Sequence, residues 1–276
     1  MSLDISKENI GFIGTGNIAS AMISAIIKRR VIHPEQIFAF DIDLSKLSKL
    51  KAKTGINVLS DSRCVARKTT VIFLTIKPGI YTDVLEEISD LLTKDHILVS
   101  VAPGITTGFI KEKTRNVCKI VRTMPNIACL VEEGMTAISA NHGLNPDELN
   151  HLKDILSTFG KLEEVNEDLM DIVTALSGSS PAFIFMLIEA MADSGVMMGI
   201  PRDQAYRLAA QSVLGSVKMF MESNKHPGEL KDMVCTPGGT TIQGIHSLEL
   251  NGFRGVIMDA IRATALKSKE LTCENS

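Results

Sequence analysis

Residues 10–19 read IGFIGTGNIA, and this stretch decides the fold. Its apolar start is typical of a short buried strand, and the residues from Asn17 onward have helical spacing. Between them lies a G-x-G-x-x-A turn formed by Gly14, Gly16 and Ala19. In such a turn the glycines let the backbone bend and approach a pyrophosphate, and the small third residue lets helix and strand pack closely. The anion then lies at the helix N-terminus, where unpaired N–H groups favour negative charge. The alternative is a tight turn without a ligand.

The order of strand and helix recurs through the first half of the chain. Further strands are expected at 37–41, 71–76, 96–101, 119–124, 135–140 and 161–165. Helices are expected from Leu44, Tyr81 and Thr106, and over 146–159. Short β-rich runs that alternate with helices predict right-handed βαβ units and a mainly parallel sheet. We therefore predict an α/β fold whose residues 1–165 form a Rossmann-type, doubly wound dinucleotide-binding domain.

Several polar residues end the predicted strands. Asp41 ends the second strand, about 20 residues after the glycine-rich turn, where such folds place the residue that meets the adenosine ribose. A carboxylate there accepts from the 2′-hydroxyl and repels a 2′-phosphate, which favours NADH; alternatively, Asp41 caps the helix near Leu44. Residues 75–78 and 100–104 lie at the carboxyl edge of the sheet, where ligands of open α/β sheets bind. Lys77 can equally be a solvated lysine at a strand end.

Residues 166–276 are predicted to be helical. Pro181 stands where the first turn of a helix over 181–198 is expected. Ser177 to Pro181 are interpreted as a flexible junction that caps this helix, with a catalytic serine as the alternative. The segment 201–221 is apolar on most sides, which predicts burial in a core or in a subunit interface. A small methionine-rich domain of such helices predicts a homodimer at least.

The stretch 235–249, CTPGGTTIQGIHSLE, combines two glycines with two threonines ahead of a helical run. Gly238 and Gly239 permit close backbone approach, and Thr240 or Thr241 can cap the following helix. A turn and cap alone is one interpretation. The other is a small anion site at a helix N-terminus. Because the first turn already offers a place for the pyrophosphate, this anion is expected to be a carboxylate of the substrate.

The amino-acid composition limits the kinds of molecule that the protein is expected to bind. The formal charge is −3, from 29 basic and 32 acidic residues, which gives no reason to expect nucleic acid or an anionic membrane. No segment approaches 18 uninterrupted apolar residues, and the N-terminus does not resemble a signal peptide. Five widely spaced cysteines suit a reducing cytoplasm, and the six histidines show no metal-binding spacing. A cytoplasmic protein with a small-molecule substrate and no metal is expected.

The motifs together resemble the pyrroline-5-carboxylate reductase family over residues 10–269. The segments that carry the resemblance are GFIGTGNIA, VIFLTIKPGI, SVAPGIT, RTMPN, LSGSSPAFIFMLIEAMADSGVMMG, PRDQAYRLAAQ, HPGELKDMVCTPGGTTIQGIHSLE and NGFR. The resemblance implies reduction of 1-pyrroline-5-carboxylate to L-proline by NADPH or NADH, the last step of proline biosynthesis. It also implies an all-helical C-terminal dimerisation domain, an active site at the dimer interface, and possible rings of dimers.

The resemblance also assigns residues. The cofactor-binding set is Ile13, Gly14, Thr15, Gly16, Asn17, Ile18, Thr75, Ile76, Lys77, Pro78, Val101 and Ala102, to which Asp41 is added from its position. The substrate-binding set is Thr236, Gly238, Gly239, Thr240 and Thr241, with Thr241 as the catalytic residue that hydrogen-bonds the ring nitrogen.

Two departures from the family pattern affect the cofactor. Pro103 replaces the usual alanine and removes one N–H donor, and Asp41 stands where NADPH-using members commonly carry small hydroxyl residues. Two rival functions remain open: a non-catalytic nucleotide-binding sensor and a β-hydroxyacid-type dehydrogenase. The second relies on a lysine in the first long helix of its second domain, and residues 181–198 contain none.

Overall fold

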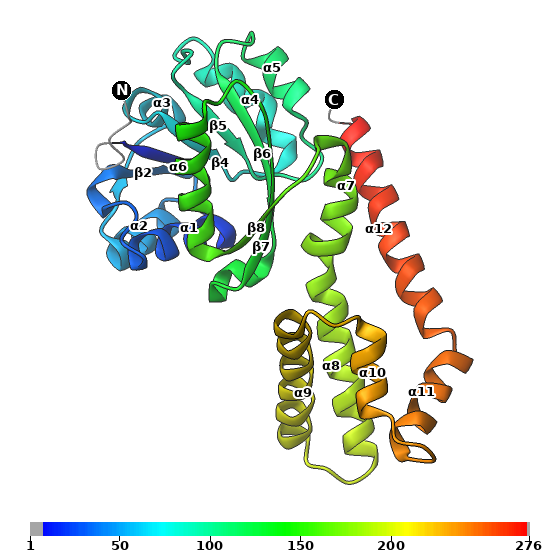
Figure 1. The fold of residues 1–276 in the computed structure, drawn as a ribbon. Helices are drawn as coiled ribbons and strands as arrows, with labels where there is room; N and C mark the ends of the chain where they lie inside the picture. Colours follow the sequence, from blue (N-terminus) through cyan, green and yellow to red (C-terminus); the bar gives the residue numbers. More distant parts are fainter. Residues whose placement is uncertain (1–7, 275–276) are drawn as a thin grey trace. The chain divides into compact units, whose positions relative to one another are not determined.

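The computed structural model describes residues 8–274 and divides into two compact units (Figure 1). The first, here called the sheet unit, runs to Ser179 and includes the C-terminal segment from Thr264. The second, the helical unit, is formed by residues 180–263. The predicted domain boundary at 165/166 falls just after the last strand and stays a prediction.

One eight-stranded sheet forms the centre of the sheet unit, in the order β3-β2-β1-β4-β5-β6-β7-β8. The strands are β1 (Ile10–Ile13), β2 (Ile37–Phe40), β3 (Asn57–Val58), β4 (Val71–Leu74), β5 (Ile97–Ser100), β6 (Lys119–Pro125), β7 (Gly134–His142) and β8 (Gly160–Glu164). All neighbouring pairs are parallel except β6 and β7. The first six strands have the Rossmann order 3-2-1-4-5-6, which confirms the predicted fold class.

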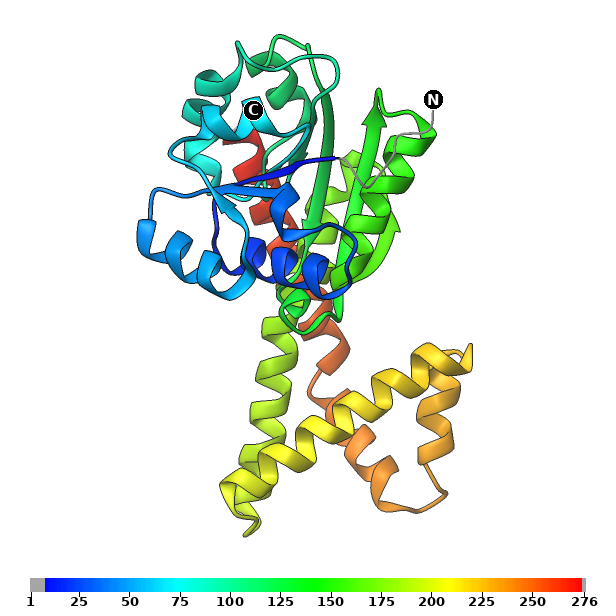
Figure 2. The ribbon, with the colours of Figure 1, turned by 90° about the vertical axis from the view of Figure 1, so that its left-hand side faces the viewer.

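Helices cover both faces of the sheet, as Figure 2 shows. One apolar core joins strand residues such as Ile10 and Phe12 to α1 (Asn17–Lys28), α2 (Leu44–Thr54) and α6 (Pro146–Leu156). A second core joins strand residues such as Ile13 to α3 (Ser62–Lys68), α4 (Tyr81–Ile88) and α5 (Thr107–Lys113). Because neighbouring side chains of a strand point to opposite faces, the apolar run of β1 supplies both cores.

A continuous helical run leaves the sheet unit after β8. It consists of η6 (Glu167–Leu169), α7 (Met170–Val173), the π-helical turn η7 (Thr174–Ser179) and α8 (Ser180–Met197). The flexible junction predicted at Ser177 to Pro181 is therefore wrong, because these residues are helical. Pro181 has no N–H to donate to the helix, and the wider π-turn just before it changes the local bonding pattern. The run Glu167–Met197 is also long and apolar enough to cross a membrane by length and composition, which alone is weak evidence.

Buried polar contacts tie the start of this run to the sheet. Arg122 on β6 is only 3% exposed, and its guanidinium lies 3.4 Å from the Glu167 carboxylate and 4.0 Å from the Asp171 carboxylate. Asp171 also accepts hydrogen bonds from Ser268 and Thr272 on α12 (Phe253–Glu274). These contacts explain why the C-terminal end of α12 belongs to the sheet unit.

The helical unit contains α8, α9 (Arg202–Ser223), α10 (Pro227–Val234), α11 (Thr240–Leu250) and the first part of α12. Figure 2 shows α8 and α9 leaving their short connection in different directions. Large apolar side chains on these helices are exposed in the single chain, among them Phe185, Met186, Leu208, Leu214, Phe220, Val256 and Met258. For the segment 201–221, burial in a core is not found in the single chain, and burial in a subunit interface stays a prediction.

Candidate active site

The glycine-rich turn begins directly after β1. Gly14 has φ +95°, and a Cβ there would lie 2.6 Å from the carbonyl oxygen of Thr75, so only glycine fits. A Cβ on Gly16, by contrast, would meet nothing within 4 Å. Gly16 is also the N-cap of α1 and provides no side-chain cap. No capping side chain therefore occupies the N-terminus of α1, and an uncapped helix N-terminus is the arrangement that binds a phosphate.

The carboxyl ends of β1, β2, β4 and β5 bring the predicted cofactor residues together. The Thr75 hydroxyl donates to the carbonyl oxygens of Gly14, at 2.8 Å, and Ile13, at 3.1 Å. The Gly14 N–H donates to the Phe40 carbonyl, and the Val101 N–H donates to the Leu74 carbonyl. Residues 75–78 and 101–102 thus lie at the same edge of the sheet as the turn, in the crevice region between β1 and β4 where the strand order reverses.

Asp41 contacts the glycine-rich turn itself. Its Oδ2 accepts from the Thr15 N–H at 2.6 Å and from the Thr15 hydroxyl at 2.9 Å. Its Oδ1 accepts from the Asp43 N–H at 2.9 Å. The side chain that caps α2 is Asp43, which accepts from the N–H groups of Ser45 and Lys46. The alternative that Asp41 caps this helix is therefore wrong, because Asp43 occupies the N-cap position.

The capping bonds also set the ionisation of Asp43. Hydrogen bonds from the backbone N–H groups of Lys46 and Ser45 hold the pKa of this carboxyl below its ordinary value. Asp43 therefore stays charged beside the turn at neutral pH, and the Lys46 ammonium lies 3.6 Å from it.

The loop after β5 has a defined turn despite Pro103. Gly104 has φ +76°, and a Pro-Gly pair with positive φ at the glycine is the pattern of a type II β-turn. Proline suits the preceding position because its ring fixes a negative φ. Pro103 thus removes an N–H donor from the loop and suits the turn that the loop forms.

A lysine-lined cavity of about 420 Å³ lies beside the glycine-rich turn. Thr15, Gly16, Asn17 and Ser20 form one side, and Lys46, Lys49, Leu50 and Lys53 of α2 form the other. The sequence interpretation missed these lysines, although their spacing on one helix face was available as a signal. Their charges favour an anion next to the phosphate-binding turn.

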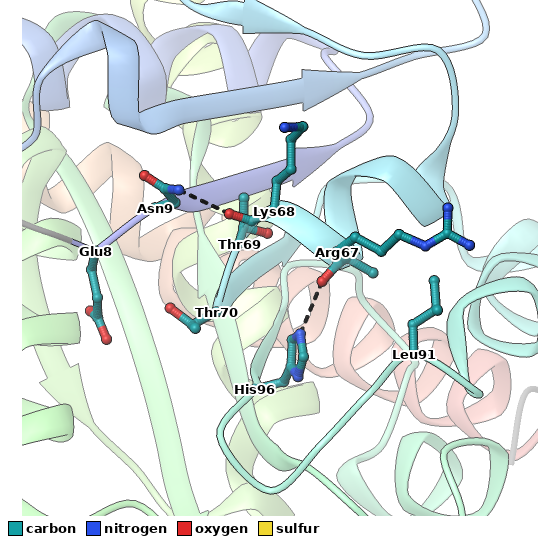
Figure 3. Close-up of a pocket in the computed structure, with 9 residues that line it drawn as sticks. Glu8, Asn9, Arg67, Lys68, Thr69, Thr70, Leu91 and His96 are labelled. Atoms are coloured by element: carbon teal, nitrogen blue, oxygen red, sulfur yellow. Dashed lines mark hydrogen bonds between the residues drawn. The ribbon is translucent and has the colours of Figure 1, made fainter.

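A cavity of about 460 Å³ lies at the opposite edge of the sheet, where β1, β4 and β5 begin (Figure 3). His96 there accepts from the Thr93 N–H through Nδ1, so its Nε2 carries the proton that is donated to the Ala66 carbonyl. Asn9 donates to the Lys68 carbonyl. These side chains tie the last turn of α3 to the segments just before β1 and β5, and none belongs to the carboxyl edge.

The second predicted site lies in the helical unit, between α10 and α11. The Gly239 N–H donates to the Thr236 carbonyl at 3.0 Å, and Gly238, with φ +69°, follows Pro237, as in a type II turn. A Cβ on Gly239 would lie 2.3 Å from the Thr236 hydroxyl and 3.1 Å from its carbonyl oxygen. The turn therefore requires glycine at two successive positions.

The threonines that follow do not cap α11. Gly239 is the N-cap, without a side-chain cap, and Thr240 and Thr241 already belong to the helix. The expectation that one of them is the cap is wrong, because the helix begins one residue earlier. Its first N–H groups and both hydroxyls are thus left available for a ligand.

Across residues 8–274, no group of three or more His, Cys, Asp or Glu residues is arranged to hold a metal ion.

Comparison with known families supports both units. A model of the family described as "Pyrroline-5-carboxylate reductase dimerisation" matches residues 167–271. A model described as "NADP oxidoreductase coenzyme F420-dependent" matches residues 9–104.

The chain is similar to characterised proteins over nearly its whole length. It is 41% identical to pyrroline-5-carboxylate reductase of Escherichia coli strain K12, with 96% of this chain and 99% of the relative covered. It is 42% identical to the enzyme of the same name from Methanosarcina acetivorans, with 97% and 99% covered. The crystal structure of Plasmodium falciparum pyrroline carboxylate reductase with NADP bound matches with a TM-score of 0.88 and 33% identity, covering 97% of this chain and 99% of that one.

Proposed function

Because this chain belongs to the pyrroline-5-carboxylate reductase family, we propose that its glycine-rich turn holds the nicotinamide nucleotide and its TPGGTT loop holds the imine substrate. The reaction is the last step of proline biosynthesis, the reduction of 1-pyrroline-5-carboxylate to L-proline by NAD(P)H. The single observation that carries this function is the identity of 41% that extends over both units.

The turn fits the phosphates of a dinucleotide. Open space above Gly16 and the uncapped N-terminus of α1 supply N–H donors where a pyrophosphate would bind. Residues 13–18, 75–78 and 101–102 would hold the rest of the nucleotide, and Asp41 would face the adenosine ribose. When bound, the nucleotide supplies the hydride. NADP is bound by the Plasmodium relative, and the lysine-lined cavity suits such a cofactor, whereas the Asp41 charge favours NADH.

The TPGGTT loop suits a carboxylate. The turn at Gly238 and Gly239 and the free N–H groups of α11 offer hydrogen-bond donors to the substrate carboxylate, with the Thr236 and Thr240 hydroxyls beside them. Thr241 would hydrogen-bond the ring nitrogen and orient it. A protonated imine already has an electrophilic carbon, so the protein contributes mainly orientation. This agrees with the lack of an obvious histidine or glutamate acid in the loop.

The protein is a homodimer, since residues 167–271 match the family's dimerisation domain. The exposed apolar side chains of α8, α9 and α12 would form the interface, with the active site next to it. A ring of dimers and a cytoplasmic location are further parts of the proposal.

Consumption of NADH and of NADPH with pyrroline-5-carboxylate tests the function directly. We expect turnover with at least one nucleotide. Folded, dimeric protein that binds a nucleotide without any turnover would instead indicate a nucleotide sensor. Turnover of a hydroxyacid in place of the imine would indicate the dehydrogenase type, although α8 has no lysine to support it.

A further inference from the structure

The carboxylate of Asp41 is almost fully used by bonds within the protein. Oδ2 accepts two hydrogen bonds from Thr15, at 2.6 and 2.9 Å, and Oδ1 accepts one from the Asp43 N–H at 2.9 Å. Thr15, in the middle of the glycine-rich turn, is 2% exposed. The contact therefore joins the residue after β2 to the turn through a buried residue.

A count of acceptor sites shows what is left for a ligand. A carboxylate offers about four lone-pair sites, two on each oxygen. Three of them are occupied by Thr15 and the Asp43 N–H. The remaining site is on Oδ1 and can accept one ribose hydroxyl. Accepting from two ribose hydroxyls would require the loss of a bond to the turn or to Asp43.

We propose that Asp41 is a positioning residue, which fixes the backbone of the glycine-rich turn through Thr15 and leaves one acceptor site for the adenosine ribose. The inference rests on the proposed use of this turn for the cofactor. Hydrogen bonds to a charged group are among the stronger ones in proteins, and the pyrophosphate is bound by backbone groups of this same turn. Asp41 thus supports the binding of NADH and NADPH alike.

The negative charge of Asp41 favours NADH and repels the 2′-phosphate of NADPH. Nearby lysines reduce this effect of the charge. Lys46, Lys49 and Lys53 line the cavity on the same side of the turn, while Asp43 adds one further negative charge. Three lysines against two aspartates leave the surroundings of the turn positive overall. Losing the bonds to Thr15 should therefore lower the affinity for both nucleotides by a large factor. Losing the charge of Asp41 should change the ratio of NADH to NADPH affinity by a smaller factor.

Two substitutions of Asp41 separate the effect of its hydrogen bonds to the turn from the effect of its negative charge. Asp41→Ala removes all three hydrogen bonds and the charge. Asp41→Asn removes the charge, but its amide oxygen can still accept both hydrogen bonds from Thr15. The amide nitrogen then faces the Asp43 N–H, so the bond to Asp43 is lost. Because hydrogen bonds to a charged group are stronger than neutral ones, Asp41→Ala should weaken binding of both NADH and NADPH by about tenfold or more. Asp41→Asn should weaken NADH binding by only about threefold or less.

The measurement is direct binding of NADH and NADPH to the full-length dimer, followed by nucleotide fluorescence, with the melting temperature as a check on folding. Asp43→Ser is the matched control: it removes an equal charge two residues away, keeps a capping side chain for α2, and leaves the Asp43 backbone N–H in place. Its nucleotide affinities should stay within about twofold of wild type.

Coupling between the two residues provides an independent check. Thr15→Val removes the hydroxyl donor while keeping the N–H and the shape. The double substitution with Asp41→Ala should be less damaging than the sum of the two single effects. Additive effects, or an Asp41→Ala protein that binds NADH normally and differs only in its NADPH preference, would overturn the proposal. Because binding is measured without the imine, a failure of the reductase assay would not affect this outcome.

Discussion

The side-chain amide of Asn126 donates to the backbone carbonyl of Ser177, with 3.2 Å between Nδ2 and the oxygen. Asn126 directly follows β6, and Ser177 lies in the π-helical turn η7. In a regular α-helix this carbonyl would accept from the N–H four residues later, but Pro181 has none. Asn126 therefore supplies a donor to a carbonyl whose α-helical donor is missing.

Asn126 is also bound from its other side, since its Oδ1 accepts from the Ala128 and Met135 N–H groups, each at 3.2 Å. Asn126→Ala would leave these groups and the Ser177 carbonyl unpaired. We expect a loss of about 1–3 kcal/mol in the free energy of unfolding, measured by urea denaturation. Ser177→Ala is the control, because the Ser177 hydroxyl lies 3.5 Å from Nδ2 and contributes little. Equal stability of the two variants would show that Asn126 does not hold the turn.

Features whose conformation depends on residues close together in the chain could be predicted from the sequence. The glycine-rich turn, the strand-helix alternation and the glycines of the TPGGTT loop could be predicted because their conformations are set within a few residues. The two-residue strand β3 was missed because it is too short to show a periodic pattern. The bonds between Asp41 and Thr15 join residues distant in sequence, so no local pattern indicates them. The shared helix face of Lys46, Lys49 and Lys53 is a local pattern, but the sequence does not tell which part of the fold that face meets.

Gly239 should be essential for substrate binding and not for nucleotide binding. A side chain at this position would collide with the Thr236 hydroxyl and approach its carbonyl, so Gly239→Val must distort the turn. Steady-state kinetics should show a rise in KM for pyrroline-5-carboxylate of about tenfold or more, since a misplaced carboxylate loses its charge-assisted hydrogen bonds. Affinity for NADH and NADPH, measured by fluorescence, should stay near wild type.

Gly244→Ala serves as the control for this substitution. Gly244 lies within α11, and an added Cβ would meet no atom within 4 Å. Alanine is the better helix former, so this variant should keep its KM and gain slightly in stability. If Gly239→Val lowers substrate and nucleotide affinity together, the cause is a folding defect and the assignment of the loop fails.

Tyr81 should make the protein less stable at high pH. Its hydroxyl donates to the Leu74 carbonyl at 2.8 Å, and burial raises its pKa from 10.0 to about 12. The unfolded chain therefore releases this proton at a lower pH than the folded protein does. The resulting stability is complete below pH 10 and is lost as the pH rises toward 12. In a Tyr206→Phe background, where Tyr81 is the remaining tyrosine, absorbance at alkaline pH should report this late titration.

The matching substitution is Tyr81→Phe. It removes the ionisable group, so the free energy of unfolding should fall less steeply between pH 10 and 12 than in the parent protein. Denaturant titrations at several pH values give the slope. An identical slope in both proteins would mean that another group causes the alkaline loss of stability.

Leu214 on α9 should separate dimerisation from nucleotide binding. Its side chain is 60% exposed in the single chain, which is unusual for a leucine in the apolar segment of a long helix. Leu214→Glu would place a charge within the proposed interface, where burial without a partner is costly, so sedimentation should show monomers. Turnover should fall with dimerisation, while NADH binding persists because the proposed cofactor residues all lie in the sheet unit. Lys218→Glu changes a neighbouring exposed, charged position of the same helix and should remain dimeric. A Leu214→Glu protein that is dimeric and fully active would exclude this face of α9 from the interface.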